Sequence, residues 1–491
     1  MTPEIAIALA VFATPLASVL IVLTGRWPNL RELVTMTTAV GLFATVLTLL
    51  PIVQSGIRPA LDVWEILPGL SLAFEVEPLG MLFSLVASGL WIMTAIYAVG
   101  YMRGHHESNQ TRFFACFPIA IASAMGIAFA ANMFTLFIFY EVLTISTYPL
   151  VAHQGNSDAK RGARVYLGLL IGTSIGLQLL AIIWTWMATG TLDFRENGIL
   201  AGHVSEAAIP ILLALYMFGI GKAALMPFHR WLPAAMVAPT PVSALLHAVA
   251  VVKAGVFTVL KVVVYIFGID LLADTGAATW LSYVAVFTLI SASLVAMTKD
   301  NLKARLAYST VSQLAYIVLG ASLATSWGII GGGMHIAMHA FGKITLFFCA
   351  GAILVAEHKT QISQLNGIGK RMPITMTAFF IAAVSIIGLP PTGGTWSKWF
   401  LALGTVDGEQ FFLLAALMIS SLLNIAYLMP IPARAFFMPD KHGEVSAFKE
   451  APLACVVPLC LTALGCLALF FFSEPIVELL TPITDQAGGA L

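Results

Sequence analysis

Eight ionisable side chains stand inside long apolar stretches of this sequence. At the centre of a membrane-spanning helix a charged side chain costs about 2.5–3.5 kcal/mol on insertion scales, so such residues are rare. Those that are kept usually face the protein interior and belong to proton or ion pathways. The eight residues are Glu141, Lys222, His247, Lys253, His335, His339, Lys343 and Lys398.

Three of these residues share one segment, GMHIAMHAFGKITLF, at the spacing i, i+4, i+8. Side chains four residues apart lie on the same helix face, so His335, His339 and Lys343 are expected to stack along one face turned away from lipid. Two histidines four apart also suit a metal ion, but no third ligand is nearby and Lys343 would repel a cation. We therefore expect no metal. For His247 alone, an ordinary hydrogen-bonded core histidine remains an alternative.

The chemistry that these residue types favour is proton transfer. Burial disfavours the charged form of a lysine, whereas a nearby carboxylate favours it. Glu141 within reach of Lys222 would hold the amine protonated, and moving the carboxylate away would release the proton. Lysines and histidines joined by water would extend this switch into a relay. The alternative is a set of salt bridges that lock the helices together, but four intramembrane lysines face only one obvious carboxylate.

The composition shows which kind of protein must position these residues. The chain of 491 residues is 59% hydrophobic and only 10% charged, and its mean hydropathy is +0.93. These values lie far outside the balance of a soluble domain and predict an all-α polytopic membrane protein. Its 24 basic and 24 acidic residues give zero net charge, and no basic tail indicates nucleic acid as a partner.

Enzyme signatures are missing from the sequence. It has no Walker, dinucleotide-binding, nucleophile-elbow or zincin motif, so we expect no cofactor and no catalytic activity in this chain. The first 28 residues lack the features of a cleaved signal peptide and are interpreted as a retained span. The cysteines have no CxxC or Cys/His spacing and are expected to be small buried hydrophobes. They are Cys116, Cys349, Cys455, Cys460 and Cys466.

A helix needs roughly 20 apolar residues to cross about 30 Å of hydrocarbon. Fourteen segments of the chain fit this requirement. The expected spans are 3–23, 32–53, 78–100, 112–130, 132–152, 164–188, 207–228, 240–267, 279–298, 303–323, 330–356, 373–403, 410–430 and 451–473.

Basic residues orient these spans. Seventeen of the 24 fall in the odd-numbered connections, whereas the even-numbered connections are assigned only Arg58, Arg195 and Lys261. Because basic residues concentrate on the cytoplasmic side, both termini are expected on the non-cytoplasmic side of the cell (inner) membrane.

Two expected spans, the seventh and the twelfth, are interrupted by proline and glycine. The breaks are GKAALMPFHRWLP (221–233) and GLPPTGGTWSKW (388–399). Such breaks leave backbone groups unpaired, which is tolerable only where protein or a water-filled cavity covers them. Each interrupted span is the fourth of a five-span block, which is the plan of an inverted repeat. Ordinary proline kinks remain the alternative. The expected units are 1–110, 111–270 (spans 4–8), 271–435 (spans 9–13) and 436–491.

Four segments carry a resemblance to a known family. They are PFHRWLPAAMVAPTPVSALLHAVAVVKAGVF (227–257), KDNLKARLAYSTVSQLAYIVLG (299–320), HAFGKITLFFCAG (339–351) and GLPPTGGTWSKW (388–399). In this order they resemble the antiporter-like subunits. This family comprises the large subunits of Mrp-type multi-subunit cation/proton antiporters and the proton-pumping membrane-arm subunits of respiratory complex I. The resemblance covers nearly the whole chain.

The resemblance implies a fold of fourteen helices with two inverted five-helix units, and a proton relay. Glu141, Lys222, Lys253 and Lys398 match the family's relay positions. The length and the wording of the eighth-span motif are most similar to the D-type large subunit of an Mrp antiporter, which implies Na⁺ or K⁺ exchange with protons and partner subunits in a hetero-oligomeric membrane complex. A complex I subunit is the runner-up, and a purely structural scaffold is a third possibility. The residues expected to connect the two half-channels are His247, His335, His339 and Lys343.

Overall fold

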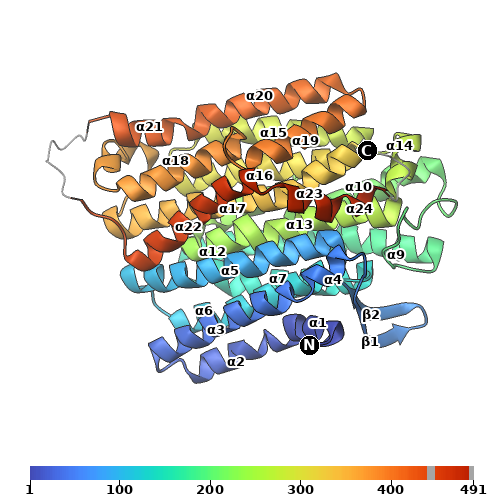
Figure 1. Ribbon diagram of the computed structural model, residues 1–491, viewed down its shortest axis with the longest axis horizontal. Coiled ribbons are helices and arrows are strands. Elements are labelled where there is room, and N and C mark those ends of the chain that lie inside the picture. The colour runs from blue at the N-terminus through green and yellow to red at the C-terminus, as the bar shows by residue number, and fades with distance from the viewer. Residues whose placement is uncertain (440–447, 486–491) are drawn as a thin grey trace.

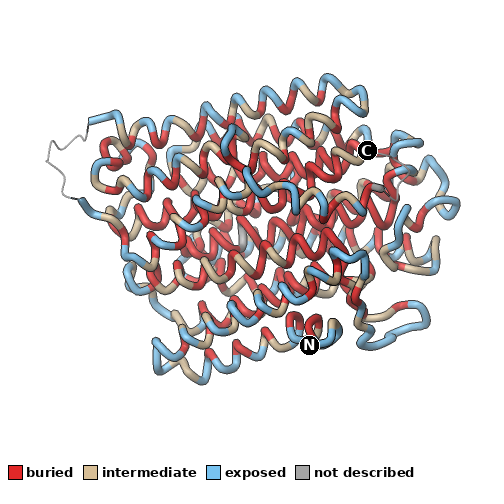
Figure 2. Tube along the Cα trace, in the orientation of Figure 1, coloured by how far each residue is buried: buried red, intermediate tan, exposed pale blue. Residues whose placement is uncertain are grey.

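The computed structural model describes residues 1–439 and 448–485, apart from the side chains of Leu246 and His247. Most helices run side by side along the long axis of the molecule (Figure 1). Buried residues fill the middle of the bundle, and exposed ones follow its outer helices and its ends (Figure 2). Many exposed side chains on the outer helices are large and apolar, such as Met187, Leu422 and Leu453. A surface of this kind is suited to lipid contact.

The helices of the two halves have the following bounds. The first half contains α1 (Pro3–Ala8), α2 (Leu16–Leu23), α3 (Pro28–Leu47), α4 (Leu50–Gln54), α5 (Pro78–Gly104), α6 (Gln110–Ala128), α7 (Met133–Val151), α8 (Ser157–Thr173), α9 (Leu179–Thr189), α10 (Ile209–Gly219), α11 (Trp231–Ala234), α12 (Thr240–Leu245) and α13 (Val251–Lys261). The second half contains α14 (Ile269–Thr275), α15 (Thr279–Thr298), α16 (Leu302–Ser322), α17 (Ser326–Glu357), α18 (Pro373–Ile387), α19 (Gly394–Asp407), α20 (Phe411–Leu428), α21 (Pro430–Phe437), α22 (Leu453–Phe471), α23 (Glu474–Leu480) and α24 (Pro482–Asp485).

Short segments of other helical types interrupt or link these helices. Wider π-helical turns, which often mark functional sites, occur inside several spans. They are η1 (Leu9–Ala13), η2 (Ser174–Gln178), η6 (Leu246–Ala250) and η7 (Val262–Phe267). The tighter 3₁₀ turns are η3 (Glu206–Ala208), η4 (Gly221–Ala223), η5 (Ala235–Val237), η8 (Ile362–Gln364) and η9 (Ile368–Lys370).

Among the described residues, 10 helices are long and apolar enough to span a membrane, or up to 11 if the bent pair at the N-terminus is one span. This confirms a polytopic helical protein. The three expected spans outside this count are the two interrupted ones and α16, so the number fourteen stays a prediction. The interrupted spans fall short because α10 has 11 residues and α18 has 15.

The structure confirms the helical class and adds a short hairpin in one connection, which the sequence did not predict. Strands β1 (Ala60–Leu67) and β2 (Leu70–Glu75) pair antiparallel between α4 and α5. Leu67 pairs with Leu70, so Pro68 and Gly69 form the turn, and Gly69 has a φ of 78°. Proline followed by a residue with positive φ is the pattern of a type II turn, which favours glycine at the second position. The hairpin projects from one end of the bundle (Figure 1).

Both expected breaks are present. The seventh expected span stops at Gly219 and continues as the single turn η4. After this turn, Ala224 adopts a left-handed conformation with φ 56°. The twelfth stops at Ile387, and Gly388 with φ 88° separates it from α19. An alanine Cβ at Gly388 would lie 2.6 Å from Cδ of Lys398, so only glycine fits there without displacing the lysine.

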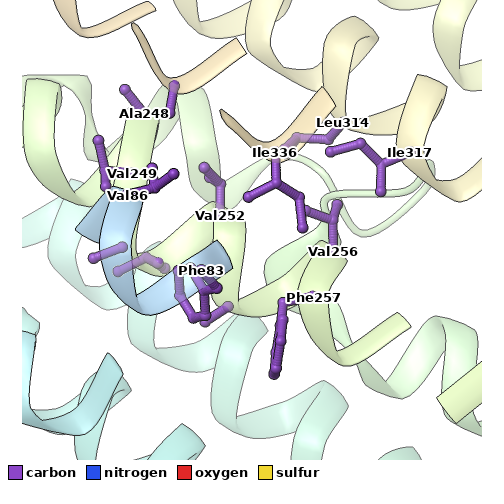
Figure 3. Close-up of a cluster of buried hydrophobic side chains, with 14 of the residues drawn as sticks. Phe83, Val86, Ala248, Val249, Val252, Val256, Phe257, Leu314, Ile317 and Ile336 are labelled. Carbon is purple, nitrogen blue, oxygen red and sulfur yellow. The ribbon is translucent and has the colours of Figure 1, made fainter. Parts of the chain in front are cut away.

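Helix α13 lies at the centre of the bundle, and the span that contains it is buried at every residue whose side chain is described. Figure 3 shows Val252, Val256 and Phe257 of α13 packed against side chains of α5, α16 and α17. The ring of Phe83 of α5 packs at a tilt against that of Phe257, with ring centroids 5.1 Å apart. The flanks of α13 in this region are therefore apolar, whereas Lys253 and Lys261 are the buried charged residues of this helix.

Candidate functional site

Lys222 lies in the first break, within η4, and is fully buried. Its Nζ donates to the backbone oxygen of Tyr140 at 2.8 Å and to Oγ1 of Thr144 at 2.6 Å. The break itself is held by Trp231, whose Nε1 donates to the carbonyl of Gly221 at 2.8 Å. The interruption of the helix therefore turns the lysine towards α7, the helix that also carries Glu141.

Glu141 does not form an ion pair with Lys222 in this conformation. Among the described residues, no acceptor–donor contact reaches either of its carboxylate oxygens, although both are buried. Lys222 instead donates to the backbone of Tyr140, the residue next to Glu141 in α7. A buried carboxylate without a partner is normally satisfied by water or by a movable donor. Glu141 and Lys222 therefore make no direct contact, and the glutamate switch stays a prediction.

Lys253 is joined to the histidine helix. Its Nζ lies 2.6 Å from Nδ1 of His339, and both side chains are buried. Nε2 of His339 has no hydrogen-bond partner among the described residues. The histidine thus has one ring nitrogen on the lysine and one available for water, which is the arrangement that proton transfer through an imidazole requires.

The expected histidine face is present on α17. The rings of His335 and His339 stack with centroids 5.7 Å apart. Nδ1 of His335 lies 2.8 Å from Oγ of Ser397, beside Lys398, and its Nε2 lies 3.2 Å from Oε1 of Gln313. His335 therefore contacts the second broken span, whereas His339 contacts α13.

Lys343 and Lys398 lie at two ends of a further polar region. Nζ of Lys343 donates to Oγ of Ser309 at 2.6 Å and to the carbonyl of Leu306 at 3.2 Å. Nζ of Lys398 donates to the carbonyl of Ile387 at 2.8 Å and to Oγ of Ser421 at 3.2 Å. Among the described residues, no carboxylate lies within 4.0 Å of any of the four intramembrane lysines that the sequence singled out.

Lys398 also lines a pocket of about 380 Å³. Exposed apolar residues at its mouth include Trp399, Met418 and Leu422, so the pocket opens towards the lipid-facing side of α19 and α20. The amine is at the inner wall beside Tyr316, whose ring centroid is 4.6 Å from Nζ. Lys398 is thus closer to the outside of the bundle than Lys253.

The sequence missed a buried ion pair. Lys261 was assigned to a connection, but it is the last residue of α13 and is 1% exposed. Its Nζ lies 3.3 Å from Oε1 of Glu77, and the Tyr265 hydroxyl donates to Oε2 at 3.0 Å. In the adjoining strand β2, burial raises the pKa of the Glu75 carboxyl, while Lys261 and Arg58 act to lower it. A carboxylate placed just before a span was the available signal.

Three sequence predictions remain, for His247, for a metal ion and for the cysteines. The side chain of His247 lies outside the described residues. Where side chains are described, no group of three His, Cys, Asp or Glu residues is arranged to hold a metal ion. Cys349, Cys455 and Cys466 are buried, and Cys116 and Cys460 are partly buried.

The fold and this line of buried lysines and histidines define a polytopic membrane protein of the antiporter-like type. The protein-family model described as "NADH:quinone oxidoreductase/Mrp antiporter, TM" matches residues 130–424. A second family model, described as "NADH-Ubiquinone oxidoreductase (complex I), chain 5 N-terminus", matches residues 68–114. The chain belongs to this NADH:quinone oxidoreductase/Mrp antiporter family, which confirms the family that its motifs resembled.

Curated relatives come from quinone oxidoreductases. NADH-quinone oxidoreductase subunit N of Desulforudis audaxviator is 31% identical over 429 residues, covering 84% of each chain. NAD(P)H-quinone oxidoreductase chain 5 of Synechocystis sp. is 31% identical over 377 residues, which are 70% of this chain and 54% of that relative. The chain therefore matches most of a subunit N and about half the length of a chain 5.

Solved structures share the fold over the whole chain. A chain of the Mrp complex from Dietzia sp. superposes with a TM-score of 0.87 at 23% identity, covering 99% of this chain and 97% of that one. A chain of the membrane-bound sulfane sulfur reductase, described as an archaeal respiratory membrane complex, also has a TM-score of 0.87, at 24% identity and with 99% and 98% coverage. At this identity the likeness establishes the fold.

Proposed function

We propose that this chain is a proton-translocating subunit of a multi-subunit monovalent cation (Na⁺ or K⁺)/proton antiporter. The observation that carries the proposal is the series of buried ionisable side chains that runs from the first broken span to the second. Residues that bear charge in such a place without carboxylate partners are best explained by proton exchange.

The roles follow the order in which the side chains lie. Glu141 gates Lys222, because an approach of the carboxylate favours the protonated amine and its withdrawal favours release. Lys253 receives the proton on the central helix and passes it to His339. His335 and Lys343 carry the proton from α17 towards the second break. Lys398 then exchanges the proton with the opposite face of the membrane. His247 is proposed as an additional member on the central span.

The two broken spans support a further part of the proposal. Each break places one lysine, Lys222 or Lys398, beside the end of an interrupted helix. This pairing favours two inverted units at 111–270 and 271–435, flanked by 1–110 and 436–491. With both termini on the non-cytoplasmic side, the two units would offer half-channels to opposite membrane faces.

A second candidate function is that of a proton-pumping membrane-arm subunit in a complex I-like NADH:quinone oxidoreductase. The likeness to subunit N of Desulforudis audaxviator favours it. In that case redox chemistry resides in partner subunits and the same relay operates here. In both proposals this chain is a transport subunit in a hetero-oligomeric membrane complex, and neither requires a cofactor in this chain.

Two measurements test these proposals. The assembled complex in inverted membrane vesicles is assayed for proton movement driven by added Na⁺ or K⁺ and, separately, by NADH. Cation-driven movement supports the antiporter, and NADH-driven movement alone supports the redox complex. In either mode, Glu141→Ala and Lys398→Ala should abolish proton movement at normal assembly. Wild-type rates in both assembled variants would refute a relay and leave a structural scaffold.

A further inference from the structure

Two facing polar stripes join Lys343 to Lys398 by a route that avoids the histidines. On α16, Ser309 and Tyr316 are seven residues apart, and on α20, Ser420 and Tyr427 are also seven apart. Seven residues make about two turns, or roughly 10 Å of helix, so each pair lies on one face. All four side chains are fully buried.

The hydrogen bonds in this region form an ordered series. Nζ of Lys343 donates to Oγ of Ser309 at 2.6 Å. Oγ of Ser309 lies 2.8 Å from the hydroxyl of Tyr427. The Tyr427 hydroxyl donates to Oδ1 of Asn424 at 2.6 Å, so its oxygen is left to accept from Ser309. Every donor in the series therefore points away from Lys343.

The other end of the stripes reaches Lys398. Nζ of Lys398 lies 3.4 Å from the Tyr316 hydroxyl, and Ser420, Ser421 and Asn424 surround that hydroxyl. Nδ2 of Asn424 and Oγ of Ser420 are buried without a hydrogen-bond partner among the described residues. Both residues lie beside the Tyr316 hydroxyl, and buried polar atoms left without a partner are where a bound water can complete a network.

We propose that Ser309 and Tyr427 form a hydroxyl branch of the proton route, which runs from Lys343 to a water held by Asn424 and Ser420 and from there to Lys398. This inference rests on the proposed function. The branch is separate from the contact of His335 with Ser397, and it carries most of the proton flow from Lys343 to the second broken span.

The transfer balances at each atom. The ammonium of Lys343 gives a proton to the Ser309 oxygen as the Ser309 hydroxyl proton passes to Tyr427. For this step the Tyr427 hydroxyl turns from Oδ1 of Asn424 to the water and gives its proton to that water. In the same event the water gives one of its own protons to the neutral amine of Lys398. Each hydroxyl accepts one proton and releases one, so no tyrosinate forms and only the two lysines change charge.

The alternative is that these hydroxyls only fasten α16 to α20. The two explanations differ in what the loss of a single hydroxyl does. Tyr427→Phe keeps the aromatic ring and removes its hydroxyl. Ser309→Ala removes the serine hydroxyl. Ser309→Thr keeps a hydroxyl. Tyr216 supplies the matched control, because it is equally buried and its hydroxyl lies 2.8 Å from Oγ1 of Thr185, away from this branch.

The test measures the initial rate of proton movement in inverted vesicles at matched amounts of assembled complex, in H₂O and in D₂O. Tyr427→Phe and Ser309→Ala are expected to lower the rate at least about tenfold and to raise the solvent isotope effect, since proton transfer becomes limiting. Ser309→Thr should retain at least about half of the rate, and Tyr216→Phe should match the wild type in both solvents.

Failure of the hydroxyl branch and failure of the proposed function give different results. Equal rates and isotope effects in Tyr427→Phe and Tyr216→Phe, together with an inactive Lys398→Ala, overturn the hydroxyl branch and leave the relay intact. An active, assembled Lys398→Ala overturns the proposed function as well.

Discussion

Lys253 and His339 form a hydrogen bond of 2.6 Å between the central helix α13 and the long helix α17. Both side chains are buried. Their contact joins Lys253 of the central helix to the helix that carries His335, His339 and Lys343. The relay that we propose depends on it, since the described residues offer Lys253 no carboxylate within 4.0 Å.

Replacing the histidine of this pair should interrupt the relay. We expect His339→Leu to lower proton movement in inverted vesicles at least about a hundredfold, because it removes a positioned proton-transfer group. His153→Leu is the control, since His153 is also buried but lies in the connection after α7. A His339→Leu complex with the activity of the His153→Leu complex would show that protons bypass the imidazole.

Thr144 should be important for Lys222. Its Oγ1 accepts from the lysine at 2.6 Å, so Thr144→Val removes a buried partner of the amine, while Thr144→Ser keeps the hydroxyl. Leaving a buried charged donor unsatisfied costs about 1–3 kcal/mol, or roughly ten- to a hundredfold in an equilibrium. We expect a loss of transport of this size in Thr144→Val only, measured as the initial rate.

Thr147 provides the comparison one turn along α7. Its hydroxyl lies close to that of Tyr166 and does not reach the lysine. Thr147→Val should therefore transport faster than Thr144→Val, and the opposite order would mean that the Thr144–Lys222 contact is incidental.

The sequence located the two helix breaks, but it did not predict the contacts between side chains of different helices. Charges inside apolar runs identified Lys222 and Lys398, and the proline and glycine around them identified the interruptions. Ser309 and Tyr427 were not predicted, because a single serine or tyrosine on an apolar helix has no distinctive period. Only the facing of α16 and α20 brings the two hydroxyls together.

Two errors have the same physical origin. Lys261 was assigned to a connection although the expected span 240–267 contains it, and its partner Glu77 is far away in the chain and becomes visible only in the fold. The β1–β2 hairpin was missed because its alternating residues were treated as part of a connection. Long-range pairing decides both cases, and hydropathy along the chain does not report it.

The Glu77–Lys261 pair should contribute to stability. Removing one member of a buried ion pair leaves an uncompensated charge and costs about 3–5 kcal/mol. Glu77→Gln is therefore expected to lower the thermal midpoint of the purified protein in detergent, as measured by intrinsic fluorescence. Adding Lys261→Met should recover much of the loss, because the orphaned charge is then removed too. A double variant no more stable than Glu77→Gln would contradict this account.

Gly255 should control how closely α13 approaches the first break. A Cβ at this position would lie 2.3 Å from the carbonyl carbon of Lys222 and 2.4 Å from the amide nitrogen of Ala223. Gly255→Ala must displace the broken segment, and overpacking of this kind costs about 1–3 kcal/mol.

Gly172→Ala is the matched control for that change, since nothing lies within 4 Å of the added methyl group. We expect transport and thermal stability to fall in Gly255→Ala and to remain unchanged in Gly172→Ala. Equal behaviour of the two variants would mean that the contact between α13 and η4 is looser than the structure indicates.

The most direct test of the central claim is proton movement by the assembled Lys222→Ala complex in inverted membrane vesicles, beside the wild type and with subunit content checked by co-purification. The account predicts normal assembly and no proton movement above that of empty vesicles. A wild-type rate in the assembled variant would show that Lys222 is not part of the proton path.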